Sequence, residues 1–142
     1  MHARDNVEPD VVTYRATIEA LDAAAQHDEC CRVYREARRA GHYASVSPRP
    51  SEMDLHDCSA AVARTILRCF LQDVQAGVSR AAGDVTVVTG KGLGSGAEGP
   101  VLGHAARAFL SESGGPRVTE VPGNAGRFVL RGEDLEAWRA GA

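Results

Sequence analysis

Val85-Thr-Val-Val-Thr-Gly-Lys-Gly92 is the stretch of sequence that decides the fold. Its first half, residues 85–88, is a run of β-prone residues that predicts a buried strand. Its second half places glycines directly after that strand, where backbone N–H groups can approach an anion closely, and adds one lysine charge. The alternative is an ordinary flexible surface loop. The candidate phosphate-binding residues are Thr89, Gly90, Lys91 and Gly92.

The segments on both sides of this stretch predict an α/β domain. Apolar spacing and turn residues predict an order of β-α-β-α-β-β-α, which fits a two-layer sandwich. Right-handed crossovers would place the first three strands side by side, with both long helices on one face of the sheet. The predicted strands are 53–56, 85–88, 117–121 and 127–130. The predicted helices run from Ser59, as N-cap, to about Gly77, from a first turn that contains Pro100 to a point before Gly114, and over 132–139.

The first 44 residues have the pattern of a helical hairpin. Apolar residues at helical spacing predict helices over 13–25 and 29–40, with Asp28 as the N-cap of the second and Gly41 as its C-cap glycine. Residues 45–51 contain two prolines and three serines, which is typical of a linker. The predicted organisation is therefore a hairpin over 1–44, a linker over 45–51 and an α/β domain over 52–142.

Composition narrows the range of functions. A net charge of −3 and 5% aromatic residues are unlike a protein that binds nucleic acid through a broadly basic or base-stacking surface. Any such affinity must therefore come from a local patch, from a partner or from a part of the protein outside this sequence. The four cysteines form no C-x-x-C pair, which predicts reduced thiols and argues against a zinc site. The sequence contains no secretory signal and no segment typical of a membrane span, so no membrane partner is expected.

Asp54 and His56, in Met-Asp-Leu-His56, form a second candidate constellation. In a strand, residues two apart lie on the same face. An adjacent carboxylate can hold one tautomer of an imidazole whose other nitrogen moves a proton. The pair could instead share a metal ion, or could be nothing more than the exposed polar end of a strand.

The two constellations occur together in one chain. The chain has Asp-Leu-His before a serine-capped helix and Thr-Gly-Lys-Gly after the second strand. This combination resembles the Smr domain family, which carries L-D-x-H and T-G-x-G motifs at these places. Met53 stands where Leu is usual, and Asp57 stands where Gly is frequent. The resemblance covers nearly all of residues 52–142.

The resemblance implies a fold and an activity. The family fold is similar to the C-terminal domain of bacterial translation initiation factor three, and its members are associated with cutting or nicking of DNA or RNA. Asp54 and His56 then take the catalytic positions, and residues 89–92 take the second motif. A divalent ion such as Mg²⁺ at Asp54 stays open. The alternatives are a non-catalytic RNA-binding or ribosome-associated module, and a protein-interaction adaptor.

The predicted hairpin has its own resemblance. Residues 9–14 (Pro-Asp-Val-Val-Thr-Tyr) and 34–41 (Tyr-Arg-Glu-Ala-Arg-Arg-Ala-Gly) are similar to a pentatricopeptide repeat, a unit that stacks and binds single-stranded RNA. Arg15 replaces the small polar residue that often reads the base. One such repeat must pack on the neighbouring domain or on further repeats upstream. The resemblance favours RNA over DNA, and a plastid or mitochondrial location for a repeat-plus-Smr protein; a cytoplasmic or nuclear one is the alternative. Four arginines of its second helix form a solvated face or a phosphate-contacting patch: Arg32, Arg35, Arg38 and Arg39.

Overall fold

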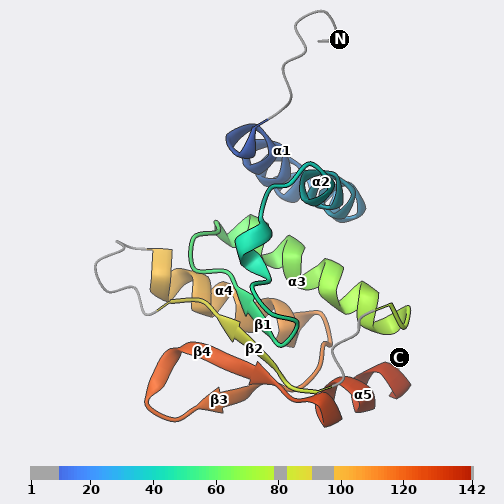
Figure 1. Ribbon diagram of the computed structural model, residues 1–142, viewed down its shortest axis with the longest axis vertical. Coiled ribbons are helices and arrows are strands. Elements are labelled where there is room, and N and C mark those ends of the chain that lie inside the picture. Colours follow the sequence, from blue (N-terminus) through green and yellow to red (C-terminus); the bar gives the residue numbers. More distant parts are fainter. Residues whose placement is uncertain (1–9, 79–82, 91–97, 142) are drawn as a thin grey trace, which may run out of the picture.

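A computed structural model describes residues 10–78, 83–90 and 98–141 of the chain. Lys91 and Gly92 lie outside the described residues. The elements, in chain order, are α1 (Val11–Ala23), α2 (His27–Arg39), a 3-10 turn η1 (Ala44–Val46), β1 (Glu52–Asp54), α3 (Ala60–Gln75), β2 (Val85–Val88), α4 (Glu98–Glu112), β3 (Thr119–Val121), β4 (Asn124–Leu130) and α5 (Gly132–Gly141). This is the predicted mixed α/β arrangement, preceded by two helices (Figure 1).

Local chemistry explains where the helices begin and end. The Ser59 hydroxyl accepts a hydrogen bond from Val62 N–H at the start of α3, as predicted for an N-cap. The prediction that Asp28 caps α2 is wrong, because the helix begins at His27. Asp28 instead lies in the first turn, where a negative charge interacts favourably with the helix dipole. Gly41 follows α2 with a φ of +96°, which confirms it as the glycine that ends the helix.

The four strands form one mixed sheet in the order β1-β2-β4-β3. Strands β1 and β2 are parallel, and β4 is antiparallel to both β2 and β3. The expectation that the third strand would lie beside the first two is wrong. The fourth strand takes that place because it supplies the buried residues Phe128 and Leu130, which pair with Val87 and Val85, whereas β3 has no fully buried residue.

The core lies on one face of the sheet. Met53, Val87 and Phe128 pair across three strands and are buried. Helices α3 and α4 lie over one face of the sheet (Figure 1). Residues one position away on each strand face the opposite side. The open face therefore carries the polar side chains of the strands.

The hairpin packs on the outer side of α3, and its apolar residues belong to the same core. Ile18 and Cys30 are fully buried in this cluster. Arg64 of α3 donates to the Asp22 carboxylate of α1 over 2.6 Å. The hairpin thus buries its apolar face against the α/β domain.

Two further expectations can be compared with the structure. All four cysteines are free thiols, three of them buried, as predicted. Within the described part of the chain, no helix has both the length and the apolar character needed to cross a membrane.

Candidate functional site

Asp54 and His56 form a close pair at the carboxyl end of β1. His56 Nδ1 lies 2.6 Å from Asp54 Oδ1, and the His56 backbone N–H donates to the same oxygen over 3.1 Å. Since a carboxylate only accepts, Nδ1 carries the hydrogen and Nε2 is the nitrogen directed away from Asp54. Leu55, between the two residues, is fully buried, and its N–H donates to the Val88 carbonyl over 2.7 Å. The backbone pairing of β1 with β2 therefore fixes the pair in place.

A second carboxylate faces the outer nitrogen of the same ring. His56 Nε2 lies 3.1 Å from Asp57 Oδ2, on a side chain that is 89% exposed. The hydrogen bond to Asp54 raises the pKa of His56 above its ordinary value, and the charges of Asp54 and Asp57 add to the effect. His56 therefore holds its proton to a higher pH than an isolated histidine.

The glycine turn lies beside this pair. Gly90 has a φ of +85°, and a Cβ built on it would lie 3.4 Å from His56 Cβ. The parallel pairing of Asp54 with Val88 accounts for the proximity, because both strands then end at the same edge of the sheet. The structure thus brings together the two described parts of the predicted site.

Thr89 lies beneath this turn and not on its surface. Its side chain is fully buried, and its hydroxyl donates to the Gly126 carbonyl over 3.3 Å. The N–H groups of Thr89 and Gly90 donate to the same carbonyl over 2.8 and 3.0 Å. All three donors are used within the protein, so these contacts fix where β2 ends relative to β4.

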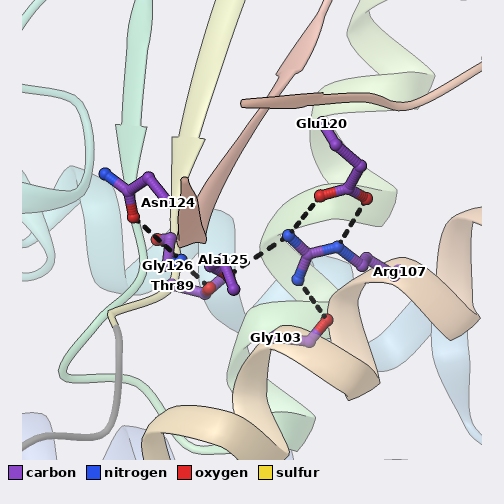
Figure 2. Close-up of polar contacts among 7 residues, drawn as sticks. All are labelled: Thr89, Gly103, Arg107, Glu120, Asn124, Ala125 and Gly126. Atoms are coloured by element: carbon purple, nitrogen blue, oxygen red, sulfur yellow. Dashed lines mark hydrogen bonds and ion pairs between the residues drawn. The ribbon is translucent and has the colours of Figure 1, made fainter. Parts of the chain in front are cut away.

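Arg107 holds the surrounding elements together, a role that the sequence analysis missed. Its guanidinium binds Glu120 through two 2.8 Å contacts and also donates to the carbonyls of Gly103 and Ala125 (Figure 2). The same group lies 5.0 Å from the centre of the Phe128 ring. It therefore joins α4 to both β3 and β4. Its only signal in the sequence is a basic residue within an apolar helix pattern, which does not identify its partner.

Arg127 is a second residue that the sequence analysis missed. It pairs with Val88 across β2 and β4, and Val88 pairs with Asp54 across β1 and β2. Paired residues point to the same side of a sheet, so Asp54 and Arg127 share the open face, about 10 Å apart at their Cα atoms. Arg127 is exposed, and no carboxylate within the described residues pairs with it. Its alternation with buried Phe128 was visible in the sequence, but the strand order was not.

His104 is exposed on α4, and the four arginines predicted to form a patch lie on α2. Arg32 pairs with Glu29 and Glu36 on its own helix, whereas Arg35 reaches Asp73 of α3 over 3.1 Å. The predicted arginine patch is therefore partly neutralised by carboxylates.

The described residues do not supply a closed metal site. They contain no group of three or more His, Cys, Asp or Glu residues placed to hold an ion. Asp54 Oδ1 is already shared by two donors of His56.

The comparison with protein families identifies the α/β part of the chain. The model of the Smr domain matches residues 53–127, which is more than half of the chain and includes Asp54, His56, Gly90 and Arg127. No match was found among curated proteins. The chain belongs to the Smr domain family, which is associated with nucleic-acid binding and with nicking endonuclease activity.

Proposed function

We propose that this protein is an endonuclease that cleaves RNA, with Asp54 and His56 as its catalytic pair. The observation that carries the proposal is the 2.6 Å contact between His56 Nδ1 and Asp54, beside Gly90 at one edge of the sheet. The resemblance of the hairpin to an RNA-binding repeat supports RNA as the substrate. Nucleic-acid binding as such follows from the family.

In the proposed reaction, His56 acts as the general acid. A hydroxyl oxygen, from the RNA 2′ position or from water, bonds to phosphorus while the bond from phosphorus to O5′ breaks. His56 Nε2 gives its proton to the departing O5′, and the proton of the attacking hydroxyl passes to water. Asp54 holds the ring and stabilises its charged form, which the raised pKa of His56 keeps populated to a higher pH than in an isolated histidine.

Arg127 on the open face is proposed to bind the phosphate. Arg127 shares this face with Asp54, and an arginine can bind a phosphate through two parallel N–H groups. Lys91 in the glycine motif is proposed to add a second charge. Thr89 and Gly90 are proposed to act by positioning, because their described donors are used internally.

The first experiment measures cleavage of end-labelled single-stranded RNA, and of DNA of the same sequence. We expect His56→Ala and Asp54→Asn to lower the cleavage rate by about 10²–10⁴-fold, as for loss of general acid catalysis. His104→Ala, another exposed histidine, is the control and should cut like the wild type. Equal rates of RNA cleavage in all four proteins would reject the catalytic roles of Asp54 and His56. Faster cleavage of the DNA than of the RNA would reject RNA as the substrate. Repeating the assay with EDTA tests whether a divalent ion takes part.

A second candidate function is nucleic-acid binding without cleavage. Asp57 favours it, because its carboxylate lies 3.1 Å from the nitrogen that would give up the proton. This alternative predicts salt-dependent RNA binding that is unchanged in His56→Ala and yields no product. A product that disappears in His56→Ala would exclude it.

A further inference from the structure

A pocket lies at the seam between the hairpin and the α/β domain. It has a volume of about 350 Å³ and is lined by α2, α3, Ser47 and β1. Volumes of roughly 300–1,000 Å³ are usual for small-molecule sites. Met53, Ile66 and Phe70 give the pocket an apolar wall. Figure 1 shows the chain passing from α2 through η1 to β1 along this seam.

The pocket is bordered by positive charge that the protein only partly neutralises. Arg35 pairs with Asp73 over 3.1 Å, so this arginine joins α2 to α3. Arg38 donates to the Tyr34 hydroxyl over 3.2 Å. Neither Arg38 nor Arg39, both exposed, has a carboxylate partner in the described part of the chain. The guanidinium groups of Arg38 and Arg39 are therefore available to an anionic ligand, and Phe70 lines the same pocket.

We propose that the seam pocket binds one nucleotide of a single-stranded nucleic acid. Its base would lie against the Phe70 side of the wall, and its phosphate would lie between Arg38 and Arg39. An apolar wall with an aromatic ring suits a base of any sequence, and arginine suits a phosphate. The assignment rests on the proposed function, because the bound strand is taken to be the substrate of the Asp54–His56 site.

The position of the pocket connects it to that site. Met53 lines the pocket, and the next residue, Asp54, belongs to the candidate catalytic pair. Consecutive strand residues point to opposite faces. Because β1 is an edge strand, a single-stranded ligand can pass around it and contact both places. The pocket would then hold the substrate at a nucleotide away from the cleaved bond.

The test is binding of a fluorescently labelled single-stranded RNA to the full chain, measured by anisotropy over a range of salt concentrations. We expect the Arg38→Ala, Arg39→Ala double variant to bind about tenfold more weakly. Its slope of log affinity against log salt should become shallower by about 0.7, because the contact with one phosphate is lost. Phe70→Leu, which keeps an apolar side chain, should weaken binding by roughly fivefold or more. Arg32→Ala is the matched control, because that arginine lies on α2 outside the pocket and is paired with Glu29.

The outcomes separate this inference from the proposed nuclease. Weaker binding in the pocket variants but not in Arg32→Ala supports the pocket, even if no protein cleaves the RNA. Pocket variants that bind like the wild type overturn the pocket, while cleavage that depends on His56 would still support the nuclease. Competition by poly-glutamate is a further test. If poly-glutamate displaces the labelled RNA as effectively as unlabelled RNA does, the assignment of the pocket to a nucleotide is overturned. Thermal unfolding of each variant shows whether lost binding reflects lost folding.

Discussion

His56 has a carboxylate at each of its ring nitrogens, and the two carboxylates differ in their surroundings. Asp54 is held by the strand, whereas the Asp57 side chain is 89% exposed and free to turn away. A phosphodiester that reaches Nε2 must displace Asp57. Asp57 therefore competes with the substrate in the proposed reaction, while Asp54 assists it.

The first prediction concerns the pH dependence of cleavage. The pKa of His56 is raised, so its acid form is populated below that pKa and is lost as pH rises through it. Asp57→Asn removes one of the charges that raise the pKa, so it should lower the pKa of His56 and shift the falling limb of the rate profile to lower pH. NMR titration of the imidazole signals measures the pKa directly, with His104 as an internal reference. An unchanged pKa of His56 would contradict the contact with Asp57.

The second prediction concerns the turn beside His56. Gly90→Ala places a side chain at a φ of +85°, which should cost about 1–2 kcal/mol of unfolding free energy, and puts a methyl group against His56. Gly83→Ala is the control, because that glycine does not have a positive φ and has open space around its missing Cβ. Urea unfolding compares the two variants. Equal stability would argue against the left-handed turn.

At the scale of elements, Arg107 connects α4 to strands β3 and β4 through its contacts with Glu120 and Ala125. Arg107→Met should lower the free energy of unfolding by about 1–2 kcal/mol at neutral pH, because it removes the Glu120 pair and the side-chain hydrogen bonds to the Gly103 and Ala125 carbonyls. Arg131→Ala, whose ion pair with Glu133 is 3.7 Å long and exposed, should change it by less than about 0.5 kcal/mol.

The pH dependence of this contact has a definite sign. Arg107 lowers the pKa of Glu120 below its ordinary value of 4.5. The stability that comes from the pair is therefore present above pH 4.5 and is lost as pH falls through the lowered pKa. The difference between Arg107→Met and the wild type should shrink in acid, and a difference that stays constant while the Glu120 carboxylate is protonated would contradict the assignment.

The elements were predictable to different degrees. Residues 85–88 form a strand as predicted, because four β-prone residues stand between turn residues. The cap at Ser59 was also readable, since it depends on residues three apart. The strand that pairs with β2 could not be predicted in this way. Its choice depends on which of two strands, both distant from β2 in sequence, supplies side chains that can be buried in the core. Thr89 illustrates the same limit within the site: its motif was visible, but its burial against Gly126 depends on that strand order.

At the scale of the whole molecule, the hairpin and the α/β domain share one core. Ile18→Ala should destabilise the chain by about 2–5 kcal/mol, since the side chain is fully buried in that core. In this variant, the midpoint of unfolding should shift to the same extent whether it is followed by circular dichroism or by the fluorescence of Trp138, on α5. Val12→Ala, at a residue that is 54% exposed, should have little effect. A shift in circular dichroism alone would indicate two independent units.

The shared position of α3 has a consequence for protein engineering. This helix contacts the hairpin through Asp22–Arg64 and Arg35–Asp73 on one side, and it covers the sheet on the other. A chimera joined within residues 45–51 would leave α3 without its outer layer and would expose apolar surface prone to aggregation. Fusion partners and affinity tags are therefore best attached before α1 or after α5. Such fusions keep the hairpin, α3 and the sheet together.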